Sequence, residues 1–424
     1  FEVNERMCSP RDPSIFGQVI LISDKAKDAD IAQNATRFED LPLSQELING
    51  IKGAKFEFCT PIQASSLPFS LNGRDVVGQA QTGTGKTAAF LITIIEDLLR
   101  HPIIDEHYLG EARAIVLAPT RELAIQIGED AKILARFTNL NIHVLVGGVD
   151  PERQLRALGR NHCDILIGTP GRLLDFLRSK DIFLDRLEIL VIDEADRMLD
   201  MGFIPQVRQL INQAPKPKLR QSLMFSATFS KEIERMVSTW TDNPIIIRSE
   251  PKDLTTKNID QKIFLTAREE KFDVLYNLLS SEELNNVIIF ANRRDTCRSL
   301  YERLRGHKFK VGLLSGEVPQ KKRIKTLEQF KKGQINLMVA TDVAGRGIHI
   351  DGVTHVINFE LPEEPEDYVH RIGRTGRAGE KGTSISFACE DDAFLLEPIE
   401  ALLNEKLLCT LPPEHLFERS QEKI

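Results

Sequence analysis

The stretch AQTGTGKT, Ala80–Thr87, follows a short apolar run and opens a helical pattern. A phosphate-binding loop has Gly, four residues and then Gly-Lys-Ser/Thr. Gly85-Lys86-Thr87 supplies the end of that pattern, whereas Ala80 stands where its first glycine is expected. Small residues let backbone N–H groups converge on phosphate oxygens at a helix N-terminus. The loop therefore predicts a nucleotide site, with a chance glycine-rich turn as the alternative.

The loop supplies most of the expected nucleotide ligands. Lys86 is expected to pair with the β- and γ-phosphates, and the Thr87 hydroxyl is expected to ligate Mg²⁺. The residues predicted to bind the nucleotide here are Ala80, Gln81, Thr82, Gly83, Thr84, Gly85, Lys86 and Thr87.

A second stretch, ILVIDEAD from Ile189 to Asp196, is a buried-strand run that ends in carboxylates. Acidic residues at the carboxyl end of a strand lie beside the phosphate loop in an open α/β sheet. Asp193 is placed to hold Mg²⁺ through water, and Glu194 to orient and deprotonate an attacking water. An isolated Asp-Glu pair is more often part of a solvated loop, but its combination with the upstream loop favours ATP hydrolysis.

Around these stretches, apolar runs alternate with amphipathic helical patterns along the whole chain. Runs of β-branched residues predict parallel strands buried on both faces, and the helices complete right-handed crossovers. The polar segment SEPKDLTTKN interrupts the alternation once and predicts a linker. We therefore expect an α/β protein of two tandem domains, each a mostly parallel sheet covered by helices on both faces. The predicted divisions are an N-terminal extension over 1–36 with one short helix, a first domain over 37–248, a linker over 249–258 and a second domain over 259–424.

Charge, cysteine content and hydropathy limit the classes of protein to which the chain can belong. The 424 residues carry a net charge of −7, which argues against a general polyanion binder but leaves room for a local basic groove. Six scattered cysteines without a Cys-x-x-Cys pair argue against zinc ribbons and disulfide frameworks. No apolar run reaches the roughly 20 residues that span a bilayer. A cytoplasmic protein with no membrane partner is the expectation.

The motifs together resemble the DEAD-box RNA helicases from about Phe38 to about Leu411, since Asp193-Glu194-Ala195-Asp196 spells D-E-A-D. The resemblance implies two RecA-like domains. The other matching stretches are FEFCTPIQ (56–63), PTREL (119–123), Gly147-Gly148, TPGR (169–172), Ser226-Ala227-Thr228, VIIFANRR (287–294), Gln320-x-x-Arg323, ATDVAGRG (340–347) and HRIGRTGRAG (370–379). The second half is most similar to the helicase of the bacterial RNA degradosome.

The resemblance assigns further roles to residues in these motifs. Gln63 recognises adenine through both halves of its amide, and Phe56 stacks on the base, whereas Phe58 is expected to be a core residue. Arg374 and Arg377 of the second domain act on the γ-phosphate. The expected RNA contacts are Arg121, Gly148, Thr169, Arg172, Arg323 and Thr341, and the expected coupling residues are Asp196, Ser226, Thr228 and His370. The lysines around Arg323 are expected to form a solvated helix face.

Two departures from the family pattern occur in the second domain. Gly345 replaces an alanine, and His349 stands where the family's aspartate contacts ribose, which puts that contact in doubt. The resemblance implies an ATP-dependent, RNA-stimulated helicase that unwinds RNA locally in RNA turnover, with a scaffolding ribonuclease as a partner. An ATP-gated RNA clamp that serves as an assembly platform and a DNA translocase with the same core are the alternatives.

Overall fold

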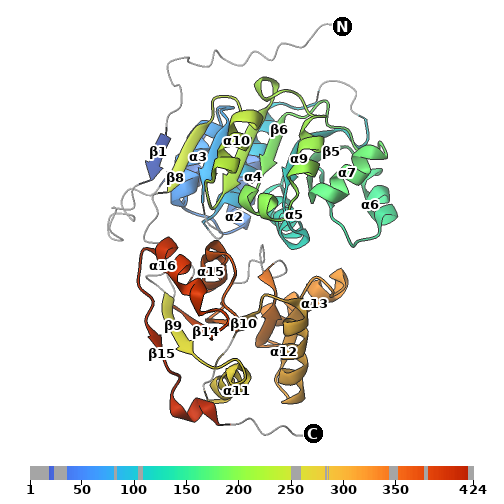
Figure 1. Ribbon diagram of the computed structural model, residues 1–424. Coiled ribbons are helices and arrows are strands. Elements are labelled where there is room, and N and C mark those ends of the chain that lie inside the picture. Colours follow the sequence, from blue (N-terminus) through green and yellow to red (C-terminus); the bar gives the residue numbers. More distant parts are fainter. Residues whose placement is uncertain are drawn as a thin grey trace. The chain divides into compact units, whose positions relative to one another are not determined.

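The computed structural model describes residues 19–22, 36–80, 84–103, 108–249, 259–281, 284, 286–342, 352–376 and 381–418. The described chain forms two compact units, of which the first contains strands β1 to β8 and the second contains strands β9 to β15. Figure 1 labels the elements of both units. Each unit is built on one sheet and is described separately below.

The first unit is built on an eight-stranded sheet in the order β1-β8-β2-β7-β6-β3-β5-β4. Every pairing between these strands is parallel. The strands are β1 (Val19–Ile22), β2 (Val76–Gln79), β3 (Ala112–Leu117), β4 (Ile142–Leu145), β5 (Cys163–Gly168), β6 (Ile189–Ile192), β7 (Gln221–Ser226) and β8 (Ile245–Ser249).

The second unit is built on a seven-stranded sheet in the order β11-β12-β10-β13-β14-β9-β15. Its named strands are also paired in parallel throughout. The strands are β9 (Ile259–Leu265), β10 (Val287–Phe290), β11 (Val311–Leu314), β12 (Leu337–Ala340), β13 (His355–Asn358), β14 (Gly382–Ala388) and β15 (Cys409–Thr410).

Helices cover both faces of each sheet. Those of the first unit are α2 (Gln45–Gly53), α3 (Pro61–Ser70), α4 (Lys86–Arg100), α5 (Arg121–Leu134), α6 (Pro151–Leu158), α7 (Pro170–Arg178), α8 (Ala195–Asp200), α9 (Ile204–Ile211) and α10 (Lys231–Trp240). Those of the second are α11 (Lys271–Ser281), α12 (Arg294–Gly306), α13 (Gln320–Lys331), α15 (Pro365–Ile372) and α16 (Leu396–Leu403). Short 3-10 helices are η1 (Phe38–Asp40), η2 (Pro217–Leu219), η3 (Ala393–Leu395) and η4 (Glu414–Phe417).

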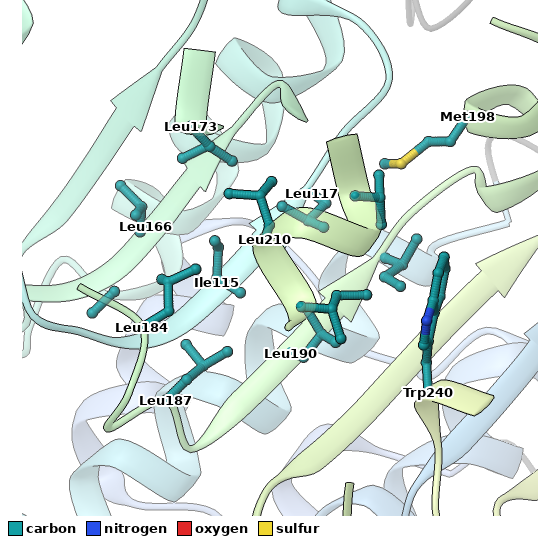
Figure 2. Packing of buried hydrophobic residues seen from close by; sticks show 14 of the residues in the cluster. Ile115, Leu117, Leu166, Leu173, Leu184, Leu187, Leu190, Met198, Leu210 and Trp240 are labelled. Atoms are coloured by element: carbon teal, nitrogen blue, oxygen red, sulfur yellow. The ribbon is translucent and has the colours of Figure 1, made fainter. Parts of the chain in front are cut away.

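The central strands consist almost entirely of apolar residues because both of their faces are covered. All four residues of β6 and all six of β3 are buried. On one face, the strand residues Ile115, Leu117 and Leu166 meet Leu173 of α7 and Leu210 of α9 (Figure 2). This packing fixes the strand ends, since a slip by one residue would turn every side chain to the opposite face of the sheet and disrupt its contacts there.

The predicted parallel strands and the helices between them are confirmed, with small shifts at their ends. Within the predicted extension, Val19–Ile22 forms strand β1 and pairs with Ile246–Ser249 of β8, and the short helix stays a prediction. Strand β15 was not predicted, since two residues carry no periodicity. Most of the predicted linker, from residue 250 to 258, lies outside the described residues, and the predicted domain limits remain predictions.

Gly50 is expected to be essential for packing in the first unit. A Cβ atom at Gly50 would lie 1.9 Å from the carbonyl oxygen of Leu134 in α5, whereas the nearest atom to one at Gly53 of the same helix is 4.0 Å away. We expect Gly50→Ala to lower the free energy of unfolding by about 1–3 kcal/mol, because backbone must move to admit the methyl group. Gly53→Ala is the matched control and should be close to wild type in a urea unfolding curve. Equal stability of the two variants would contradict the close contact.

Candidate functional site

The predicted nucleotide residues follow three neighbouring strands of the first sheet. Strands β2, β7 and β6 lie side by side, and their carboxyl ends lead to the phosphate loop, to Ser226 and to Asp193. The backbone links these ends, because Ala80 N–H donates to Ser226 O at 2.9 Å. Ligands in open α/β sheets bind at this edge. The structure therefore brings together residues that are more than a hundred positions apart in the chain.

Lys86 and Asp193 form a buried ion pair at this edge. Lys86 is the first residue of α4, and its Nζ lies 3.2 Å from Oδ1 of Asp193, whose side chain is fully buried. Burial disfavours charge on Lys86, but Asp193, Glu194 and Asp196 together raise its pKa above the ordinary value, so the ammonium is charged at neutral pH. Burial also raises the pKa of Asp193, against the attraction of Lys86. The pair holds Lys86, the lysine predicted to bind phosphate, in place at the start of the helix.

The surroundings of Asp193 fit a divalent cation. Its second oxygen, Oδ2, is buried and has no hydrogen-bond partner among the described residues. A buried carboxylate oxygen without a partner is costly unless a cation or water meets it. The described residues contain no cluster of three His, Cys, Asp or Glu side chains that would form a full protein cage. Mg²⁺ instead typically uses one or two carboxylates together with phosphates and water, and Thr87 and Asp193 are a fitting ligand set.

Glu194 adopts a strained backbone conformation. Its φ of 51° lies in the left-handed region, where residues other than glycine are uncommon and cluster at functional sites. Its Oε2 accepts a hydrogen bond from Nη1 of Arg197, one turn later on α8, and both side chains are buried. Arg197 was not predicted, because only the contact with Glu194 distinguishes it from an ordinary helix-surface arginine.

The Gln63 amide connects α3 to the phosphate loop. Its Oε1 accepts from Thr60 N–H at 2.8 Å, and its Nε2 donates to Gly85 O at 2.9 Å. Gly85 has a φ of +89°, and a Cβ there would lie 2.5 Å from Gln63 Nε2, so this close approach requires glycine. One N–H and one lone pair of the amide remain for a base. Gln63 therefore shapes the loop in addition to any contact with adenine.

Phe56 and Phe58 flank this region, and both are 44% exposed. The Phe56 ring is partly exposed, and its stacking on adenine stays a prediction. The expectation that Phe58 is a core residue is wrong. Phe58 pairs with Arg37 in an isolated antiparallel bridge, and the Arg37 guanidinium lies 4.9 Å from the centre of its ring. The alternation of aromatic and polar residues suggested a buried strand, but among the described residues Phe58 makes only this isolated bridge.

The three coupling residues of the first unit are joined by hydrogen bonds. Asp196 Oδ2 accepts from Ala227 N–H at 2.9 Å and from Thr228 N–H at 3.0 Å. The Ser226 hydroxyl accepts from Asp196 N–H at 3.3 Å and donates to Thr228 O at 2.7 Å. These hydrogen bonds tie the residues after β6 to the residues after β7.

The residues predicted to contact RNA follow the next three strands of the same sheet, β3, β5 and β4. Arg121 begins α5 after β3, and its guanidinium lies over Gly147 after β4, where an added Cβ would be 3.1 Å from Nη2. Gly148 has a φ of +73°. Thr169 caps α7 after β5, and Arg172 of that helix lies over Phe176, with Cζ 5.8 Å from the ring centre. The sheet edge thus carries nucleotide residues on one half and candidate RNA residues on the other.

In the second unit, Thr341 directly follows β12 and is buried, with its N–H donating to Leu314 O at 3.2 Å. Arg374 follows α15 and is 5% exposed, and its Nε donates to His370 O at 3.0 Å. His370 Nδ1 lies 3.7 Å from Asp367 Oδ1. Arg323 of α13 is buried, whereas the lysines of that helix are exposed as predicted. Gln81, Thr82, Gly83, His349 and Arg377 lie outside the described residues.

Comparisons with known proteins agree with this geometry. A family model for DEAD/DEAH box helicases matches residues 60–236, and one for the helicase conserved C-terminal domain matches residues 270–379. The ATP-dependent RNA helicase RhlB of Pseudomonas syringae pv. tomato is 54% identical over 385 residues, which cover 91% of this chain and 97% of the relative. The RhlB helicase of Shewanella baltica is 47% identical over 371 residues, with coverage of 88% and 84%.

Two solved structures extend the comparison. Dbp5 of S. cerevisiae bound to RNA and ADP BeF3 superposes with a TM-score of 0.78 at 32% identity, covering 89% of this chain and 96% of that one. Mss116p bound to single-stranded RNA and AMP-PNP superposes with a TM-score of 0.82 at 27% identity, covering 94% and 84%.

Fold and sequence together define the class, and the chain belongs to the DEAD-box ATP-dependent RNA helicases. Within that family it is similar to the RhlB helicases, which confirms the predicted resemblance to the degradosome helicase. Two RecA-like units, ATP binding, RNA binding and RNA-dependent ATPase activity are therefore confirmed. In the part of the chain that the structure describes, no helix combines the length and apolar character needed to cross a bilayer.

Gln63→Glu should weaken ATP binding because the carboxylate cannot donate to Gly85 O, although it can still accept from Thr60 N–H. We expect the dissociation constant for an ATP analogue to rise about tenfold, the equivalent of one lost hydrogen bond. Gln45→Glu makes the same chemical change at an exposed position of α2 and is the control. Unchanged affinity in Gln63→Glu would show that the amide has no part in holding the loop for nucleotide.

Proposed function

We propose that this helicase uses ATP to hold and bend a short stretch of RNA, which separates nearby base pairs without travel along the strand. The observation that carries the proposal is the single edge of the first sheet, where the Lys86–Asp193 pair lies beside the strands that bear Arg121, Gly148 and Thr169. Nucleotide and RNA bound there would share one framework. Most such RNA contacts reach phosphate or sugar, so little sequence preference is expected.

The proposed catalytic roles follow from the contacts. Lys86 binds the β- and γ-phosphates, and Thr87 with Asp193 holds Mg²⁺, which supplies positive charge to the phosphate oxygens when bound. Glu194, kept in place by Arg197, accepts the proton of the attacking water. Arg374 and Arg377 of the second unit stabilise the charge that develops on the terminal phosphate. Asp196, Ser226, Thr228 and His370 are proposed to link nucleotide state to the RNA side.

Arg374→Ala tests the proposed role of Arg374 at the terminal phosphate. We expect RNA-stimulated ATP turnover to fall about 10³-fold, the effect of removing an arginine that stabilises phosphoryl transfer. Binding of an ATP analogue should change little, since the phosphate loop is intact. Arg268→Ala, which breaks an exposed ion pair with Asp391 in the same unit, is the matched control. Turnover of Arg374→Ala at the wild-type level would end the proposal.

Duplex length separates local unwinding from the alternatives. If base pairs are opened locally, ATP-driven strand release should decline steeply as the duplex is lengthened, because unopened base pairs hold the strands together. A travelling motor would release long duplexes at a similar final yield. An RNA clamp would retain single strands in the presence of an ATP analogue and release no duplex. ATP turnover with matched DNA and RNA strands tests the DNA translocase.

We also propose a place in cytoplasmic RNA turnover, with a scaffolding ribonuclease bound to the second unit. The support is the similarity to RhlB helicases over most of the chain. Affinity capture from lysate with the whole chain, followed by identification of the retained proteins, tests this partner. Absence of any ribonuclease from the captured set would count against it.

A further inference from the structure

A basic surface lies at the amino ends of strands β11 and β12 in the second unit. Residues 303–316, which join α12 to β11, contain four arginine or lysine residues and no aspartate or glutamate. The end of α13, which leads to β12, adds two more exposed lysines. We refer to five of these exposed cations together as the amino-edge surface: Arg305, Lys308, Lys310, Lys331 and Lys332.

The two halves of the amino-edge surface are joined through the backbone. Val311 of β11 is in register with Leu337 of β12. The N–H groups of Asn336 and Leu337 both donate to Lys310 O, at 3.2 and 3.3 Å. None of the five cations forms an ion pair with a carboxylate among the described residues. Clustered cations without such partners create a positive potential that attracts an anion.

Aromatic rings border these cations. The ring centre of Tyr276 in α11 lies 4.6 Å from that of His307 and 5.9 Å from that of Phe309, and all three rings are partly exposed. His307 and Phe309 stand on either side of Lys308 in the chain. Lys308 has a φ of 66°, and the residue in this left-handed conformation after a helix is usually glycine or asparagine. The turn after α12 therefore presents rings and cations in alternation, with a lysine at a position that disfavours it.

This combination fits single-stranded nucleic acid better than other anions. Cations contact the phosphates of a single strand, and partly exposed rings stack on its bases. An acidic peptide would use the cations but would gain little from the rings. RNA binding is a property of the family. Strands β11 and β12 have four residues each, so the two edges of the sheet are only about 13 Å apart there and one RNA can reach both.

We infer that the amino-edge surface, together with Tyr276 and Phe309, is a second binding site for single-stranded RNA. It is separate from Thr341, the proposed RNA contact at the carboxyl edge of the same sheet. It holds the flank of a long RNA and reads no sequence, because phosphate contacts and stacking are alike for all bases. The inference depends on RNA binding by the whole chain and not on local unwinding.

The double variant Lys308→Gln/Lys310→Gln tests this site. Binding is measured with oligouridines of about 8 and about 40 nucleotides, of which the shorter fills no more than one single-strand site. We expect the dissociation constant for the longer RNA to rise about tenfold, the effect of losing two phosphate contacts at moderate salt. The slope of log affinity against log salt should become shallower by about 1.4, since each contact contributes about 0.7. Affinity for the shorter RNA should stay near wild type.

Lys262→Gln/Lys406→Gln is the matched control, because it makes the same change in net charge near β9 and β15, away from β11 and β12 in the strand order. It should bind both RNAs like wild type. Phe309→Leu keeps an apolar side chain but removes the ring. Its dissociation constant for the longer RNA should rise about fivefold through lost stacking, and its thermal unfolding curve shows whether it is folded.

Three results would each overturn the inference. The first is a double variant Lys308→Gln/Lys310→Gln that binds the longer RNA as the control does, or that loses affinity equally for both lengths. The second is a folded Phe309→Leu variant with wild-type affinity for the longer RNA. The third is binding of polyglutamate that falls in the double variant as much as RNA binding does, which would assign the surface to an acidic protein.

Discussion

Parallel strand pairing places the carboxyl ends of neighbouring strands at one edge of a sheet, and the chemistry of each unit depends on that alignment. In the first unit the order β2-β7-β6-β3-β5-β4 places the proposed nucleotide residues on one half of the edge and the proposed RNA residues on the other. The two halves meet where β6 lies beside β3, and Ile192 is in register with Leu117. Because β6 is rigid and fully buried, Asp193 and Glu194 have a fixed base from which to act. Because hydrogen bonds join the residues after β6 to those after β7, a movement of one group would displace the other.

Two buried ion pairs illustrate different uses of charge in a low-dielectric interior. Arg371 and Asp342 form a buried ion pair in which every N–H donor of the guanidinium is used. Any movement of the pair would therefore break a hydrogen bond. Lys86 and Asp193 form a pair in which Asp193 Oδ2 has no hydrogen-bond partner among the described residues, so a cation could bind this oxygen without displacing a hydrogen bond. Burial of a pair costs desolvation free energy that good geometry must offset. The Arg371–Asp342 pair suits a structural role, and the Lys86–Asp193 pair suits a site that binds a ligand.

Much of this organisation could be predicted from the sequence because it is local. Buried strands appear as β-branched runs, and the phosphate loop and DEAD motif appear as short patterns at strand ends. The failures concern contacts between distant residues. Phe58 looked like a core residue because its spacing is that of a buried strand. The sequence does not show that Phe58 pairs only with Arg37 in an isolated, exposed bridge. The attachment of Gln63 to Gly85, 22 positions away, and the five contacts of Arg371 depend on how strand ends meet. Short segments such as β1 and β15 form strands because they pair with β8 and β9 of sheets that the rest of the chain has built.

Strand β1 has one further consequence. Without it, β8 would be the edge strand of the first sheet, and a run of isoleucines, Ile245–Ile247, would lie along an open row of N–H and C=O groups. Such an edge is a template for pairing between molecules. Pairing with Val19–Ile22 closes that side of β8 and moves the sheet edge to β1, so a chain shortened beyond Ile22 would leave the hydrogen-bonding groups of β8 open to another strand.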